Sequence, residues 1–497
     1  MVNKAVAFLQ TKKESRPGGE ALVGLAMLKS GAPKEHPRVV QALDAVLASM
    51  APGKALPDEM YTPNVEMLFL NELDRQAHRA AILQLFNFVK SKQKEHGGWG
   101  YLNRPTGDTS MTQYAVLAMW ELSQHGIEMP VDTWERVANW LLRTQDPNGA
   151  FGYQGIDPGN FERVEQREVR ASMAVAGLGS LYICAHYLGL ETTTQSQGEI
   201  STALSRVDKG KPVRRQRLTT KVDPVKVTNA EYDGQRWMQV NYSIQPQAVP
   251  YLHYYLYTLE RYESFRELER GVAEQEYQWY DDGVRLLMRT QQPDGSWRSM
   301  NTELVDTSFA ILFLMRSTQK SLGKAGLLAA GTLIGGRGLP KDLSTAQLRN
   351  GEIVAKPLAG PAEKLLSVLD NPADPTYLAA VEGFREMTLE ADEATLSRQA
   401  VRLRKLAGGE EPEARLAAVV ALARIRDLDN VPTLIYALSD PDPQIVNAAL
   451  EGLRFVSRKF RGLGDGAIKD ESSRKAAIDR WKAWYRTVRP EASFDRE

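Results

Sequence analysis

The chain has 497 residues, of which 43% are hydrophobic and 25% are charged, a composition that supports two domains with substantial apolar cores. Its 62 basic and 62 acidic side chains balance, which argues against a nucleic-acid-binding protein. No uninterrupted apolar run of about 18 residues is present, so we expect no membrane span. The single cysteine, Cys184, excludes an internal disulfide and is predicted to be a buried, inert thiol.

A short phrase recurs three times in the first two thirds of the chain. It consists of a glutamine, three residues, a glycine, one residue and a large aromatic, in the copies Gln93–Trp99, Gln145–Phe151 and Gln291–Trp297. The copies begin 52 and then 146 residues apart, close to one and three steps of a single period. A period of roughly 20–50 residues with a fixed internal phrase indicates a repeat architecture.

Each phrase closes an apolar helix and leads through a tight loop into a second, more apolar helix. In two copies an Asp-Thr-Ser sequence follows 11 residues after the glycine, beginning at Asp108 and Asp306. The middle copy has a longer loop, and Arg170 stands at the corresponding point. The predicted unit is therefore a first helix, a glycine–aromatic loop and a second helix.

This unit predicts six helix pairs over residues 1–320. We expect first helices near 2–13, 37–49, 75–95, 132–146 and 275–291, and second helices near 19–30, 61–74, 108–125, 168–189, 246–265 and 305–318. No first helix is identified for the fifth pair, because residues 191–235 are polar and irregular and are expected to form an insert. Second helices that are apolar nearly all round are buried, so we expect an outer layer around an inner one that encloses a cavity.

The repeated phrase and the Asp-Thr pairs resemble the α/α toroid of prenyltransferases and squalene cyclases. The resemblance covers residues 1–320 and implies an all-α fold, an (α/α)6 toroid of the terpenoid cyclase and prenyltransferase type. Cyclases of this family donate a proton from the central Asp of Asp-x-Asp-Asp-Thr. Val305 and Gly107 occupy that position before Asp306 and Asp108, and neither side chain can donate a proton.

Protein prenyltransferases of the same type hold zinc partly through an Asp-x-Cys pair, and here Ser110 and Ser308 replace the cysteine. A hydroxyl is a poor zinc ligand, so we expect no metal and no cofactor. The resemblance therefore predicts the scaffold without the chemistry of the family.

Three residues are weak catalytic candidates. Asp108 and Asp306 act either as helix N-caps, the interpretation we favour, or as acid–base or cation-stabilising groups near the cavity mouth. His253 is either a general base or a hydrogen-bonded core histidine. We favour the core histidine, because the sequence shows no catalytic partner for it.

An aromatic-rich stretch at 246–265 gives the candidate ligand-binding residues. If this helix is an inner one, its tyrosines fall on one side and either hold an apolar ligand or simply fill the core. The candidate set is Tyr251, Tyr254, Tyr255, Arg170, Trp99 and Trp297.

A second repeat follows a linker at 321–360, in which Asn350-Gly351 predicts a small hairpin. The pattern that begins at Pro412 recurs 31 residues later at Pro443, and an earlier copy begins near Ala379. These copies resemble HEAT repeats over about 361–460, and a helix with Trp481 is predicted to cap the stack to residue 497. The resemblance implies a short α-solenoid that binds a protein partner; the alternative is a purely structural cover for the toroid.

Together these features predict a non-catalytic toroid joined to a HEAT-like interaction domain, with a protein partner and an apolar small molecule as ligands. The alternative is an enzyme that uses the toroid cavity on an isoprenoid or a polysaccharide. The compartment is expected to be cytoplasmic by default, and extracytoplasmic if an upstream leader is missing, because Met1–Gln10 has no signal-peptide pattern.

Overall fold

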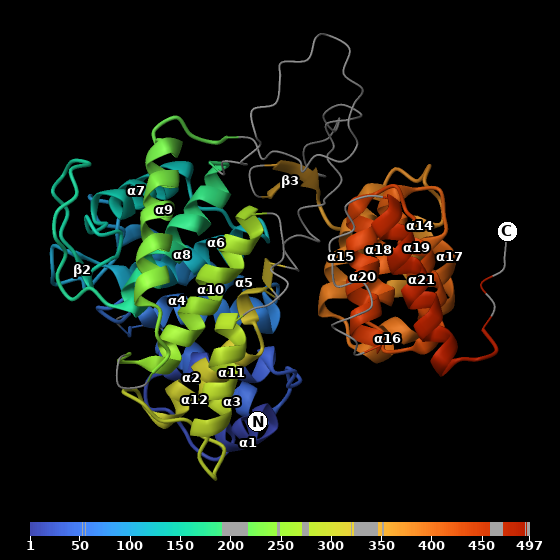
Figure 1. Ribbon diagram of the computed structural model, residues 1–497, viewed down its shortest axis with the longest axis horizontal. Helices are drawn as coiled ribbons and strands as arrows, with labels where there is room; N and C mark the ends of the chain where they lie inside the picture. Colours follow the sequence, from blue (N-terminus) through green and yellow to red (C-terminus); the bar gives the residue numbers. More distant parts are fainter. Residues whose placement is uncertain are drawn as a thin grey trace, which may run out of the picture. The chain divides into compact units, whose positions relative to one another are not determined.

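The computed structural model of the chain describes residues 1–190 except 52 and 55, 217–245, 249–270, 278–319, 321–322, 346–349, 352–457, 471–492 and 494. Within these residues the chain is predominantly helical, with two short two-stranded sheets, and the predicted helical class is confirmed (Figure 1). The chain separates into two compact units, Met1–Leu204 with Val213–Leu322, and Ser205–Pro212 with Gly323–Glu497.

The first unit contains six pairs of helices among its described residues. The first helices are α1 (Val2–Leu9), α3 (Pro37–Ser49), α5 (Arg79–Ser91), α7 (Val131–Arg143), α9 (Pro224–Asn241) and α11 (Gln278–Thr290). The second helices are α2 (Pro17–Lys29), α4 (Tyr61–Asp74), α6 (Thr109–Ser123), α8 (Ala171–Leu188), α10 (Leu252–Arg270) and α12 (Glu303–Leu314). Helix α9 supplies the first helix that the sequence analysis did not identify. The rest of the expected insert, 191–216, lies outside the described residues.

The second helices contact one another in cyclic order. Contacts run from α2 to α4, α6, α8, α10 and α12, and α12 returns to α2. Almost every residue of α6 and α8 is buried, whereas first helices such as α3 and α5 bury one face. Helix α8 is long and apolar enough to cross a membrane by length and composition alone, but 94% of it is buried inside the unit, as in a core helix.

Three loops, Gln93–Trp99, Gln145–Phe151 and Gln291–Trp297, attach one pair to the next, and we call them docking loops. In each, the glutamine amide donates one hydrogen bond to the carbonyl of the loop's own glycine, at 2.8–3.0 Å. It donates a second, at 2.8–3.1 Å, to a backbone carbonyl of another first helix or of the residue that precedes it. The three acceptors of that second bond are Thr133 O on α7, Ala230 O on α9 and Met1 O at the start of α1.

The backbone conformation and a close backbone contact require glycine at the second fixed position of the phrase in each docking loop. Gly97, Gly149 and Gly295 have φ angles of 110°, 99° and 92°. A Cβ atom on these glycines would lie 2.1–2.4 Å from the backbone oxygen of Arg136, Asp233 and Lys4, respectively. In each loop that oxygen belongs to the residue three positions after the one whose carbonyl accepts the second hydrogen bond of the glutamine. Because the register is the same in all three, the loop after α11 docks on α1 as the others dock on α7 and α9.

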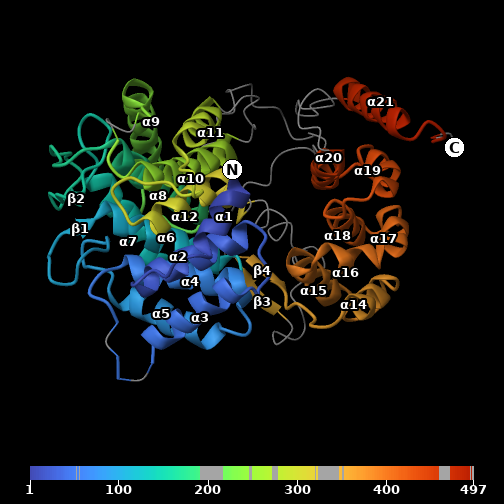
Figure 2. The same ribbon diagram turned by 90° about the horizontal axis from the view of Figure 1, so that it is seen from below.

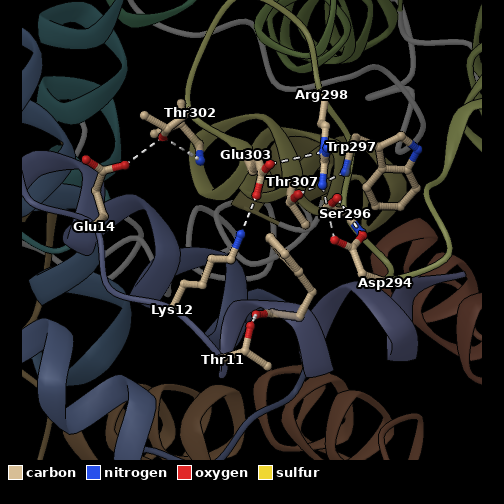
Figure 3. Close-up of polar contacts among 12 residues, drawn as sticks. Thr11, Lys12, Glu14, Asp294, Ser296, Trp297, Arg298, Thr302, Glu303 and Thr307 are labelled. Atoms are coloured by element: carbon tan, nitrogen blue, oxygen red, sulfur yellow. Dashed lines mark hydrogen bonds and ion pairs between the residues drawn. The ribbon is translucent and has the colours of Figure 1, made fainter.

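Side chains add to this contact between the beginning and end of the first unit (Figure 3). Lys12 Nζ lies 2.5 Å from Glu303 Oε2, and the Thr302 hydroxyl donates to Glu14 Oε2 at 2.6 Å. The Lys12 and Glu303 side chains are 51% and 32% exposed, so this ion pair contributes less than about 1 kcal/mol. The docking loop and the buried helix faces therefore hold the contact.

The second unit contains three helix pairs in its described residues. They are α14 (Ala362–Leu369) with α15 (Tyr377–Glu390), α17 (Ala400–Ala407) with α18 (Pro412–Leu422), and α19 (Val431–Ala437) with α20 (Pro443–Ser457). In Figure 2, α14, α17 and α19 follow one side of this unit and α15, α18 and α20 the other. The short helices α16 (Glu393–Ser397) and η2 (Leu428–Asn430) connect consecutive pairs.

The helix pairs of the second unit share one apolar core, because α18 contacts both α15 and α20. Helix α21 (Glu471–Val488) contacts α19 and contributes Trp481 and Tyr485 to the same core. A hairpin of β3 (Ala346–Arg349) and β4 (Glu352–Ala355) precedes the helices.

Candidate functional site

The first unit contains a cavity of about 620 Å³ at the N-terminal ends of its six second helices. Every one of these helices contributes a side chain from its first two turns to the wall. The residues are Leu22 of α2, Val65 of α4, Tyr114 of α6, Met173 of α8, Tyr254 of α10 and Phe309 of α12. The volume falls in the range of about 300–1,000 Å³ that is usual for small-molecule sites.

Aromatic rings form a continuous part of the wall. The centroid of the Tyr114 ring lies 5.8 Å from that of Tyr61 and 6.4 Å from that of Tyr254. The Tyr254 ring lies 5.8 Å from Phe309 in an edge-on contact. Burial raises the pKa of Tyr61, Tyr114 and Tyr254 above its usual value, so these phenols stay protonated and can donate hydrogen bonds.

Tyr101 and Tyr153 also line the cavity, and their hydroxyl oxygens are 3.4 Å apart. Each lies two residues after the aromatic of a docking loop, in the sequences Trp99-Gly100-Tyr101 and Phe151-Gly152-Tyr153. Neither residue was predicted as part of a site, although the repeated aromatic-Gly-Tyr pattern marks both. Tyr61 and Tyr114 were not predicted either, and they carry no repeated pattern.

Two arginines occupy helix starts at the rim. Arg16 is the N-cap of α2 and Arg170 is the N-cap of α8, and neither helix has a side-chain cap. Arg16 pairs with Glu14 at 3.1 Å, and Arg170 lies 3.4 Å from Glu168. Since both arginine side chains are more than a third exposed, the two pairs leave their guanidinium groups accessible from the cavity.

Asp108 is the N-cap of α6, as the favoured interpretation predicted. Its carboxylate accepts hydrogen bonds from Met111 N at 3.0 Å, Ser110 Oγ at 2.6 Å and Gln154 Nε2 at 2.7 Å. The residue is completely buried and does not line the cavity. Burial raises the pKa of this carboxyl above its usual value.

Asp306 is not an N-cap, and that part of the prediction is wrong. Helix α12 begins nearly a turn earlier, where the Thr302 hydroxyl accepts from Val305 N at 3.4 Å. The Asp306 carboxylate instead accepts from Ser299 N at 2.5 Å and Asn301 Nδ2 at 3.0 Å. Although burial acts to raise its pKa, the adjacent His253 and hydrogen bonds from Asn301 and Ser299 hold the pKa of Asp306 below its usual value.

The other predicted site residues divide between the cavity wall and the core. Arg170, Tyr251 and Tyr254 line the cavity. His253 is buried with its Nδ1 3.3 Å from Asp306 Oδ1, and Tyr255 is completely buried; neither lines the cavity.

Trp99 and Trp297 are completely buried in their docking loops, away from the cavity wall. Their indole N–H groups donate to Val89 O at 2.8 Å and Leu287 O at 2.9 Å on the preceding first helices. These contacts attach the two loops to their helices, which accounts for a tryptophan at this position in two of the three copies of the phrase.

No group of three or more His, Cys, Asp or Glu side chains that could hold a metal ion occurs among the residues that the structure describes. Asp281 and Asp282 lie one residue apart on α11, so their side chains diverge around the helix.

Residues 400–492 match the family of HEAT repeats. The match spans α17 to α21 of the second unit. HEAT repeats are interaction modules, and they suggest a protein-interaction role for this part of the chain. No curated protein is similar enough to the chain to match it.

Proposed function

We propose that the protein is a non-catalytic binding protein with two parts, a first unit that holds a small molecule and a HEAT-like unit that holds a protein partner. We further propose that the first unit is an α/α toroid over residues 1–320 and that the HEAT-like domain covers 361–497. The cyclic contacts of the second helices and the three docking loops of equal register support the toroid.

One observation carries the proposal for the first unit: its cavity presents hydroxyl and aromatic groups but neither of the two family aspartates. The carboxylates of Asp108 and Asp306 bind the backbone and neighbouring side chains beneath the wall. General acid–base catalysis requires contact with the substrate directly or through one water. A wall that includes Glu59 and Glu168 but lacks both of these aspartates favours binding over the chemistry of the family.

The HEAT match and the exposed apolar residues of the second unit support a protein partner. Val401 on α17 and Tyr436 on α19 are 76% and 70% exposed, and these two helices contact each other. Large exposed apolar side chains are a common feature of protein-binding surfaces. We expect the double substitution Val401→Ser and Tyr436→Ser to abolish capture of a partner by the full-length protein.

Native mass spectrometry of the full-length protein tests the small-molecule part. We expect a non-covalent adduct that dissociates from the protein, chemically unchanged, when the protein is denatured. The Ser172→Trp variant should lack this adduct, because Ser172 lies in the cavity wall. Ser439→Trp, at an exposed position of the second unit, is the matched control and retains the adduct. An adduct-free wild-type protein would contradict the proposal.

A hydrogen-bond relay favours enzymatic use of the cavity as a second candidate function. Tyr61 and Ser110 line the cavity, and their hydroxyls are 2.7 Å apart. Ser110 then donates to Asp108 at 2.6 Å, so protons have a route from the cavity to a carboxyl whose pKa burial has raised. Chemical conversion of the bound molecule by the wild type, but not by Ser110→Ala, would favour this candidate over simple binding.

A further inference from the structure

We propose that the ligand of the cavity is a polyhydroxylated ring compound, a sugar. This inference rests on the proposed small-molecule function of the first unit and names the chemistry of its ligand. It is carried by the density of hydroxyl groups on the wall, by one hydroxyl that lacks a partner, and by the aromatic faces beside it.

Hydroxyl and amide groups dominate the polar part of the wall. Of the 21 residues that line the cavity, ten carry such a group, and six of these ten are tyrosines. Several of these groups bond to other protein groups, as Tyr61 does to Ser110, but a hydroxyl can both donate and accept hydrogen bonds. A purely apolar ligand would remove water from the capacity that is left without replacing its hydrogen bonds, which is unfavourable. A ligand with several hydroxyls of its own satisfies them.

Tyr114 supplies the most specific observation. Its side chain is only 3% exposed, it lines the cavity, and its hydroxyl makes no hydrogen bond with any residue that the structure describes. The ring is fixed between Tyr61 and Tyr254, and the Arg261 guanidinium lies 5.8 Å from its centroid. The hydroxyl is therefore a positioned donor and acceptor that only a molecule in the cavity can satisfy.

The same wall offers apolar surface of the right shape. The rings of Tyr61, Tyr114, Tyr254 and Phe309 adjoin one another at interplanar angles of 80°, 34° and 70°, so they line the wall with both ring faces and ring edges. A sugar ring has one face of C–H groups and a rim of hydroxyls, so it can pack on an aromatic ring while its rim bonds to phenols. Tyrosine offers both kinds of contact from one side chain.

Charge at the rim is balanced, since Arg16 and Arg170 line the cavity together with Glu59 and Glu168. The backbone N–H groups of Tyr61 and Thr62 already donate to Glu59. Neutral sugars and sugars with a carboxylate share the hydroxyl and ring chemistry described above, and the two arginines offer partners to the carboxylate. The experiment below distinguishes these two sources.

The test is titration calorimetry on the full-length protein with maltotriose, trigalacturonic acid and farnesol. Tyr114→Phe removes only the unpartnered hydroxyl from the wall. Tyr255→Phe is the matched control, because the Tyr255 hydroxyl is also buried, has no hydrogen-bond partner among the described residues and lies away from the cavity. We expect at least one sugar to bind, and Tyr114→Phe to weaken it about three- to tenfold, as loss of one hydrogen bond predicts, with no change in the control.

Each other outcome overturns the inference. Binding of farnesol alone, with equal or tighter binding to Tyr114→Phe, would make the ligand apolar and leave the proposed binding function intact. Sugar binding that Tyr114→Phe and Tyr255→Phe alter equally would place the sugar outside the cavity. Absence of binding by all three probes would reject the sugar class, and only an adduct-free native mass would reject the binding function as well.

Discussion

The two ends of the second helices in the first unit are built differently. Their N-terminal ends surround the cavity of about 620 Å³, which we call the open end. Toward their C-terminal ends, which we call the closed end, a small pocket of about 10 Å³ lies between side chains such as Leu25, Leu117 and Leu312. Ser317 and Thr318, which follow α12, are buried there.

Polar contacts hold the closed end together. Lys29 Nζ lies 2.7 Å from Glu72 Oε2 and 3.2 Å from Ser321 Oγ, and Ser321 donates to Glu121 at 2.7 Å. Although burial favours the neutral amine, Glu72 and Glu121 hold the pKa of Lys29 above its usual value. The same helices thus use buried charges for stability at one end and present hydroxyl groups to a cavity at the other, which is the distribution expected of a site and its support.

The largest expected effect is at the closed end. Lys29→Ala leaves buried carboxylates without their cation, and we expect a loss of about 3–5 kcal/mol in the free energy of unfolding, measured by urea denaturation. Lys12→Ala, which breaks the exposed pair with Glu303, is the control and loses less than about 1 kcal/mol. Equal losses would contradict the structural role of the closed end.

The next effect concerns the docking loops, which lead into the open end. Gly97→Ala adds a Cβ atom 2.1 Å from Arg136 O at a positive φ, and we expect a loss of about 3–4 kcal/mol. Gly31 also has a positive φ, 97°, but no atom lies within 4 Å of an added Cβ. Gly31→Ala therefore measures the backbone strain alone, and we expect it to lose about 1–2 kcal/mol in the free energy of unfolding. A melting series in which both variants lose the same stability would remove the steric argument for docking.

A third prediction concerns Glu66, a buried carboxyl group that makes the stability of the first unit depend on pH. Burial raises the pKa of Glu66 on α4 to about 7 from its usual 4.5, against a hydrogen bond from Ser49. Between these pH values the unfolded chain ionises while the folded one does not, so stability falls as pH rises. Glu66→Gln should therefore gain about 2–3 kcal/mol on the wild type between pH 4.5 and 8. A difference between the two proteins that does not change with pH would contradict this prediction.

The smallest effect on stability is expected at the rim of the open end. The Arg170 and Glu168 side chains are 37% and 56% exposed, so Arg170→Ala should change the free energy of unfolding by less than about 0.5 kcal/mol. Since Arg170 lines the cavity, the same variant should weaken the adduct seen by native mass spectrometry. A large loss of stability would show that the rim is structural.

Local sequence signals predicted much of this molecule. Apolar periodicity identified all six second helices, and a 31-residue period identified the helices that begin at Pro412 and Pro443. The glutamine and the glycine of the repeated phrase recur because each makes the same contact in all three docking loops. The indoles of Trp99 and Trp297 make matching contacts in two of the loops. A signal repeated along the chain is readable without knowledge of the tertiary structure.

Features that depend on tertiary contacts were missed. Helix α9 is polar on average, so its hydropathy does not reveal the few residues, such as Val227 and Met238, that it buries. The start of α12 at Glu303 places Asp306 inside the helix, although its sequence matches that of the N-cap Asp108. Tyr114 gains its role only because helices distant in the sequence surround it.

The difference in access between the two ends is tested most directly by cysteine labelling. The native Cys184 is completely buried, and burial raises the pKa of its thiol, so it should stay unreactive. Ser172 in the cavity wall and Ser317 at the closed end are 3% and 5% exposed, and each can be replaced by cysteine and treated with iodoacetamide. We predict rapid alkylation of Ser172→Cys and protection of Ser317→Cys until the protein unfolds. Equal rates in the folded protein would contradict an open cavity at one end and a closed core at the other.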